Sequence, residues 1–142
     1  MTNIKYRVWD KERRMMCSVA RISFGDDGAA LTILAEPAPV GEFYRGLVHG
    51  ESGILMQFTG LKDKNGKEIY EGDIVAVWEN GINDEMADKK NYEVEWGGVD
   101  YPAFTLDGWE NGEMNAFSEI SMSGDWEYEV IGNIYENPEL IL

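Results

Sequence analysis

The chain has 142 residues, of which 44% are hydrophobic and 12% aromatic, so it suits one domain with an apolar core rather than a disordered chain. Its 12 Lys and Arg against 27 Asp and Glu give a formal net charge of −15, which argues against binding to nucleic acid or to an anionic membrane surface. Cys17 is the only cysteine, which excludes an internal disulfide and zinc sites built on cysteine pairs.

The first part of the chain is predicted to form three strands. Residues 4–9 alternate, with Ile4, Tyr6 and Val8 on one face, and this period of two is typical of a half-buried strand. Residues 15–24 and 29–35 form the next two strands around a Gly-Asp-Asp-Gly turn. Two prolines within residues 36–52 break the pattern, so this segment is predicted to be a loop or an irregular crossover, with a short helical piece as the alternative.

The centre of the chain is predicted to contain a hairpin. Residues 54–59 and 73–78 have the pattern of strands. Asn65-Gly66 lies between them and predicts a type I′ turn, which needs positive φ at both central positions. Gly72 and Asp73 predict a second sharp turn in which the aspartate binds backbone amides. Residues 80–90 are polar and are predicted to form a loop.

The C-terminal part adds three expected strands. In residues 92–96 the aromatic and aliphatic side chains alternate with Glu93 and Glu95, and residues 103–106 and 126–135 also have strand patterns. Gly97-Gly98 and Asn111-Gly112 mark turns, Gly132 suggests a bulge, and Pro138 predicts one terminal helical turn. Residues 113–122 fit no single pattern. Short strands at regular spacing predict a mainly β protein that is either a barrel or a sandwich, and this number of strands in this length favours a small barrel.

Few residues have a pattern that indicates chemistry. His49 is the single histidine, but without a neighbouring Cys or acid pair it is predicted to be a loop residue. Residues 63–68 (DKNGKE) are faintly similar to a calcium loop but lack its third oxygen ligand and its final Glu. Cys17 is expected to be a buried, inert thiol. Tyr101, Trp109 and Trp126 lie among acids, so a cation-binding aromatic surface is one interpretation and core packing is the simpler one.

We therefore predict no catalytic, cofactor-binding or metal-binding residue, and no enzyme. The charge is uneven along the chain. Residues 1–21 carry six Lys and Arg against two acids, whereas no Lys or Arg follows Lys90 and twelve acids do. The basic start and the acidic end of the chain can attract each other within one subunit or between subunits. The simpler interpretation is that the acidity only keeps the protein soluble.

Three segments are similar to a known family: residues 6–11 (YRVWDK), residues 57–75 (QFTGLKDKNGKEIYEGDIV) and residues 129–140 (EVIGNIYENPEL). Together they resemble the YopX family of phage and prophage proteins. The resemblance implies a mainly β, SH3-like barrel that spans 1–142 as one domain, with N-terminal strands and a crossover loop in residues 1–50, the barrel core in residues 51–142, and short helical pieces. The family has no established biochemical activity and no assigned site residues, so none is carried over.

Three functions remain open. The first is a phage interaction module that contacts a protein partner or forms a homo-oligomer, because a β fold leaves strand edges exposed. The second is an acidic decoy that imitates nucleic acid and occupies a DNA- or RNA-binding protein of the host. The third, disfavoured by the net charge, is nucleic-acid binding through Lys5, Arg7, Lys11, Arg13 and Arg14 with Trp9 for stacking. A polar start after Met1 and the lack of a long apolar run favour the bacterial cytoplasm and no membrane contact.

Overall fold

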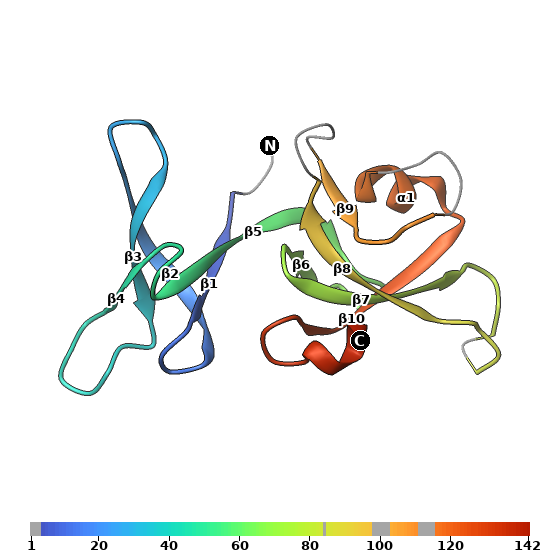
Figure 1. Cartoon of the computed structure of the whole chain (residues 1–142). Helices are drawn as coiled ribbons and strands as arrows, with labels where there is room; N and C mark the ends of the chain where they lie inside the picture. The colour runs from blue at the N-terminus through green and yellow to red at the C-terminus, as the bar shows by residue number, and fades with distance from the viewer. Residues whose placement is uncertain (1–3, 84, 98–102, 111–115) are drawn as a thin grey trace. The chain divides into compact units, whose positions relative to one another are not determined.

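The computed structural model describes residues 4–83, 85–97, 103–110 and 116–142 (Figure 1). The chain divides into two compact units. We call residues 4–57 the N-terminal unit and residues 58–142 the C-terminal unit. The boundary falls after Gln57, whereas the sequence suggests a division after residue 50. That the whole chain acts as one domain stays a prediction.

The N-terminal unit is an antiparallel sheet with strand order β4-β3-β2-β1-β5. Its strands are β1 (Tyr6–Asp10), β2 (Met15–Phe24), β3 (Ala30–Glu36), β4 (Arg45–Val48) and the first part of β5 (Gly53–Lys62). Alternate side chains from four of these strands form its core, which is made of Val8, Cys17, Ile33, Ala35 and Leu47. The first three predicted strands are thus confirmed, with Val8, Cys17, Ile33 and Ala35 as buried apolar side chains. In β1, however, Trp9 and Asp10 are buried beside Val8, so burial does not follow a period of two there.

Strand β4 corrects one prediction. We expected residues 36–52 to lack a strand, but Arg45–Val48 pairs with β3, Leu47 opposite Ile33. The four-residue strand has a single buried side chain, Leu47, so its sequence carries almost no alternation from which to predict it. β4 forms because β3 supplies hydrogen-bond partners, which is a tertiary cause.

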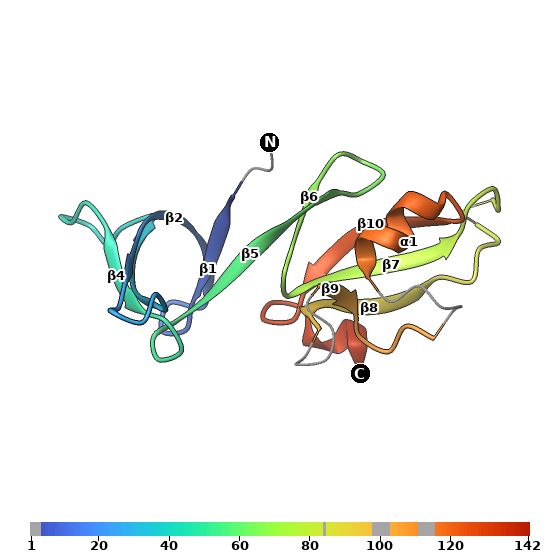
Figure 2. The same cartoon turned by 90° about the horizontal axis from the view of Figure 1, so that it is seen from above.

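The C-terminal unit contains a second antiparallel sheet of order β10-β7-β8-β9. Its elements are the end of β5, β6 (Glu68–Tyr70), β7 (Asp73–Glu79), β8 (Lys90–Trp96), β9 (Phe104–Leu106), α1 (Phe117–Ser123), β10 (Trp126–Asn133) and the 3₁₀ turn η1 (Pro138–Ile141). Figure 2 shows α1 beside β10. The core of this unit joins sheet and helix through Ile69, Val75, Val77, Tyr92, Val94, Leu106, Phe117 and Ile120.

The fold is mainly β, as predicted, but the described strands form two antiparallel sheets and no closed barrel. In the described part of the chain, β9 and β10 lie at opposite ends of the second sheet and are not paired with each other. The barrel prediction is therefore wrong in this respect, and an SH3-like arrangement is not confirmed. Period-two patterning identifies strands, but it does not say whether the first and last strands of a sheet meet.

The turns discussed next form where the sequence predicts them, but one differs in its type. The hairpin between β5 and β6 forms, but Gly66 has positive φ (80°) and Asn65 does not, so its turn is not type I′. Gly132 lies at a register shift in the pairing of β10 with β7, which confirms the bulge. Pro138 begins the 3₁₀ turn, as expected.

Within the undecided residues 113–122, the structure forms α1 from Phe117 onward, and its apolar side chains Phe117 and Ile120 are buried. No helix of the described residues combines the length and the apolar character that a membrane crossing needs. Gly98, Tyr101 and the Asn111-Gly112 turn lie outside the described residues.

Candidate functional site

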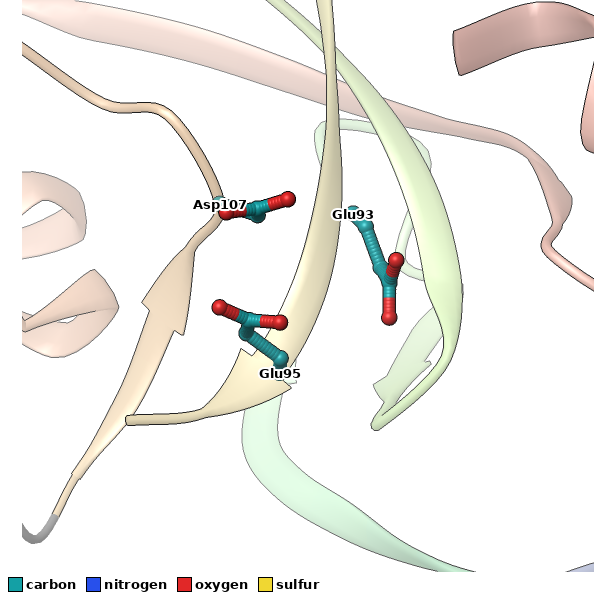
Figure 3. Close-up of side chains that lie close together, drawn as sticks. All are labelled: Glu93, Glu95 and Asp107. Carbon is teal, nitrogen blue, oxygen red and sulfur yellow. The ribbon is translucent and has the colours of Figure 1, made fainter. Parts of the chain in front are cut away.

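Three carboxylates meet on the C-terminal unit (Figure 3). Glu93 and Glu95 are two residues apart on β8, so they share one face of the sheet. Asp107 follows β9, and its amide donates a 2.9 Å hydrogen bond to the carbonyl of Glu93. One carboxylate oxygen from each residue lies within 4.8 Å of the others. Alternation along β8 places Glu93 and Glu95 side by side, and the pairing of β8 with β9 brings Asp107 to them.

Burial and nearby negative charges make the two glutamates of this cluster harder to ionise. Burial raises the pKa of Glu93 above its ordinary value, and the charges of Glu95, Asp107 and Glu71 raise it further. Burial and Asp107 raise the pKa of Glu95 in the same direction. Oxygen ligands of this kind suit hard cations such as Ca²⁺ and Mg²⁺. Acidic groups also gather on protein surfaces without an ion, so the cluster alone assigns no metal.

A second feature of the C-terminal unit is a pocket of about 260 Å³. It is lined by aromatic residues, charged residues and two aliphatic residues: Tyr92, Trp109, Trp126, Glu79, Asp88, Lys90, Val77 and Ile82. Strand pairing explains the grouping, because Trp126 lies opposite Glu79 and Val77 lies opposite Lys90. The pocket thus lies over β10, β7 and β8 on one face of the sheet.

The aromatic rings of the pocket stand edge to face. The ring centroids of Trp109 and Trp126 are 4.9 Å apart at 81°, and those of Tyr92 and Trp109 are 5.3 Å apart at 64°. Such edge-to-face pairs fix ring orientation. Trp109 and Trp126 also pack against the core, so the core interpretation of these aromatics is supported, but they line a pocket as well.

Two of the residues singled out from the sequence have structural roles in the N-terminal unit. His49 Nδ1 accepts a 3.1 Å hydrogen bond from the amide of Leu55, in the turn between β4 and β5, which agrees with its prediction as a loop residue. Cys17 is 3% exposed, as expected. Burial raises the pKa of its thiol, and a thiol that stays protonated is a poor nucleophile.

The segment with a faint likeness to a calcium loop is a hairpin turn. Asp63 Oδ1 accepts hydrogen bonds from the amides of Asn65 and Lys67, and Oδ2 accepts one from Val130, each of 2.9 Å. Both oxygens are therefore occupied by backbone donors. Asp73 Oδ2 likewise accepts a 2.8 Å hydrogen bond from the amide of Tyr70, which confirms the turn role predicted for it.

Arg13, one of the basic residues near the start, and Arg45 of β4 lie beside a buried aspartate. Asp10 is fully buried, and its Oδ2 pairs with Nε of Arg13 at 2.6 Å and with Nε of Arg45 at 3.1 Å. Burial raises the pKa of Asp10, but the hydrogen bonds from Arg13 and Arg45 outweigh burial and leave it lowered. Trp9 is only 7% exposed, so its ring is not presented for stacking on a base.

The two units differ in charge. The N-terminal unit has seven Lys and Arg and seven Asp and Glu, and 7 − 7 = 0. The C-terminal unit has five Lys and Arg and 20 Asp and Glu, and 5 − 20 = −15. The whole net charge of the chain is therefore carried by the unit that holds the acidic cluster and the pocket.

A family model described as YopX protein matches residues 5–142. The chain belongs to the YopX family. Among solved structures, protein EF1440 from Enterococcus faecalis is similar with 26% sequence identity, a TM-score of 0.66 and full coverage of both chains. Protein yopX from Bacillus subtilis is 23% identical with a TM-score of 0.53, again over both full chains, and this likeness shows the fold alone. Curated proteins give no match.

The resemblance to the YopX family drawn from three segments is thus confirmed, and the match extends through the stretches between them. The acidic cluster was not anticipated as a unit. Its signal was the Glu-x-Glu alternation of β8, which could have identified two of the three carboxylates. Asp107 joins them only through the pairing of β8 with β9.

Proposed function

We propose that this YopX-family protein is a phage- or prophage-encoded binding protein of the bacterial cytoplasm, not an enzyme, and that it self-associates through the β4 edge of its N-terminal unit. The observation that carries the proposal is an unpaired strand edge next to exposed apolar side chains. β4 is the last strand of its sheet and has one hydrogen-bonded neighbour, β3, among the described strands. An edge strand of this kind offers backbone donors and acceptors to another strand.

Apolar side chains accompany this edge. Val40 and Phe43, in the loop before β4, are 106% and 92% exposed. Tyr44 and Val48 are also exposed. A group of exposed apolar side chains favours a surface that a partner covers when it binds.

The second copy of this chain is the occupant that charge favours. The N-terminal unit has no net charge, so its own residues add no net repulsion between two such edges. Two β4 strands that pair antiparallel form a self-complementary, two-fold interface. The sheet would then continue across both subunits.

Light scattering on a size-exclusion column tests this proposal at low and high salt. A dimer is expected for the parent chain. Phe43→Asp should give a monomer, because dimerisation would then bury an unpaired carboxylate at the interface. Met122→Asp is the matched control, since Met122 is an exposed apolar residue (86%) of the C-terminal unit. A parent chain that is monomeric under all conditions removes the self-association.

The location of the charge favours one alternative, an acidic decoy for a nucleic-acid-binding protein. Its support is that all 15 excess negative charges belong to residues 58–142. Affinity capture from host cells should then recover basic nucleic-acid-binding proteins, and high salt should release them because it screens the attraction. Recovery of only neutral or acidic proteins counts against the decoy.

A further inference from the structure

We propose that the pocket formed by Tyr92, Trp109 and Trp126 binds the guanidinium group of an arginine side chain on a partner protein. The site belongs to the C-terminal unit and does not depend on self-association through β4. Its volume of about 260 Å³ is below the range of about 300–1,000 Å³ typical of pockets for whole small molecules. One side-chain head group is the occupant that fits this size.

The electrostatics of the pocket favour a cation. Two carboxylates, Glu79 and Asp88, line it against one cation, Lys90, which leaves one negative charge. Among the described residues no ion pair joins either carboxylate to a cation. The carboxylates are exposed and therefore remain available to a charged partner.

The aromatic rings point to the same chemistry. A cation over the face of an indole is attracted by the ring, and tryptophan is the strongest aromatic partner. The same unit already uses this interaction, because the Nζ atoms of Lys89 and Lys64 lie 4.3 and 5.0 Å from the ring centroid of Trp78. Trp78 precedes Glu79 on β7 and therefore faces the other side of the strand.

Arginine fits better than lysine or a quaternary ammonium group. Its planar guanidinium stacks on an aromatic face while its N–H groups donate to carboxylates. The pocket combines indole rings with two carboxylates, whereas a quaternary ammonium group has no N–H to donate. The pocket thus matches both properties of the guanidinium.

The test uses the full-length chain and three blocked tripeptides, Gly-Arg-Gly, Gly-Lys-Gly and Gly-citrulline-Gly, with the indole N–H signals of the five tryptophans followed by NMR. The arginine peptide should shift the signals of Trp109 and Trp126 saturably and leave those of Trp9 and Trp96 in place. The citrulline peptide, which has the same shape without the charge, should bind about tenfold more weakly. Equal binding of the citrulline or lysine peptide overturns the assignment, as does an absence of saturable shifts.

Charge variants separate the pocket from the general acidity of the unit. Glu79→Gln and Asp88→Asn should each weaken the arginine peptide several-fold, and Lys90→Gln should strengthen it by removing the competing cation. Glu136→Gln is the matched control. This exposed residue lies just after the C-terminal end of β10, whereas the pocket residue Trp126 is at the N-terminal end of the same strand. An equal loss in Glu136→Gln would show attraction to the whole acidic unit and would overturn the pocket as the site.

Discussion

The two units of this protein stabilise a buried aspartate at a turn in two different ways. In the N-terminal unit, Asp10 is held by the guanidinium groups of Arg13 and Arg45. In the C-terminal unit, Asp63 is 7% exposed and is held by the backbone amides of Asn65, Lys67 and Val130. Backbone amides bind Asp10 as well, because its Oδ1 accepts 3.1 Å hydrogen bonds from the amides of Glu12 and Arg13. The two aspartates therefore share peptide donors and differ in the guanidinium groups that pair with Asp10.

This difference agrees with the charge of each unit. Seven cations and seven acids let the N-terminal unit place arginine beside aspartate. The C-terminal unit has five cations for 20 acids, so backbone donors stabilise its buried Asp63. Most of its other described acids are at least partly exposed. The acidic unit thus satisfies its buried carboxylates internally, and its surplus charge remains outside for a partner.

The largest expected effect is at Asp63. Asp63→Ala removes three hydrogen bonds to a charged acceptor and should lower the free energy of unfolding by about 3 kcal/mol. Urea denaturation measures it. Asp63→Asn is the matched variant, because its amide oxygen can still accept the hydrogen bonds that Oδ1 accepts. Its free energy of unfolding should fall clearly less than that of Asp63→Ala. Equal losses in both variants would show that the negative charge and the bond from Val130 to Oδ2, which asparagine lacks, hold the turn.

Asp10→Asn is expected to cost about 2 kcal/mol at neutral pH, because Arg13 and Arg45 lose their buried anionic partner. The same denaturation experiment measures it. Glu12→Gln is the control: Glu12 also pairs with Arg45, at 2.7 Å, but its side chain is 78% exposed, and exposed pairs contribute little. A larger loss in Glu12→Gln would contradict the role given to burial.

The pH dependence of Asp10 has a defined sign. The pKa of Asp10 is lowered in the folded chain. Its contribution to the free energy of unfolding is therefore fully present above the ordinary carboxyl pKa and is lost as pH falls through the lowered value. The difference between the parent chain and Asp10→Asn should therefore shrink in strong acid. A difference that grows on acidification would contradict the lowered pKa.

Gly132→Ala tests the bulge of the C-terminal unit. A Cβ at this position would lie 2.7 Å from Cγ of Asn137, whose Oδ1 accepts a hydrogen bond from the amide of Asn133. We expect a loss of about 1.5 kcal/mol from this overpacking. In Gly46→Ala, on β4, the added Cβ meets no atom within 4 Å, so its stability should hardly change. Unchanged stability in Gly132→Ala would mean that the terminal turn moves away freely.

The smallest expected effect is a gain. Glu93→Gln relieves repulsion from Glu95 and Asp107 and should stabilise the chain by about 0.5 kcal/mol at neutral pH, a small value because solvent screens these partly exposed groups. The pKa of Glu93 is raised on folding, so the repulsion is absent below the ordinary carboxyl pKa and appears as pH rises through the raised value. The gain should vanish on acidification. Glu136→Gln, outside the cluster, serves as the control, and an equal gain there would assign the effect to net charge alone.

Much of the fold was predictable where the cause is local. The alternation of Tyr92 and Val94 against Glu93 and Glu95 indicated β8 and its buried face, and the structure has Val94 fully buried. Gly132 and Pro138 indicated a bulge and a terminal turn. β4 was missed because its four residues carry one buried side chain, and the barrel was wrong because strand patterns do not specify which edges pair.

The candidate sites were less predictable. Trp109 and Trp126 were recognised as aromatic residues among acids, but Glu79 and Lys90 had no signal that joined them to these rings. They share the pocket because Trp126 lies opposite Glu79 and Val77 opposite Lys90 in the sheet.

Residue types at short spacing were enough to predict most strands, the positions of the described glycine turns, the family and the net charge, because each of these is a property of local sequence. Folding in three dimensions was needed to set the boundary between the two units, to make β4 the end of a sheet, and to bring Asp107 to Glu93 and Glu95. Each of these depends on pairing between residues far apart in the chain. The register of such pairing is set by the packing of whole strands, and no single segment encodes it.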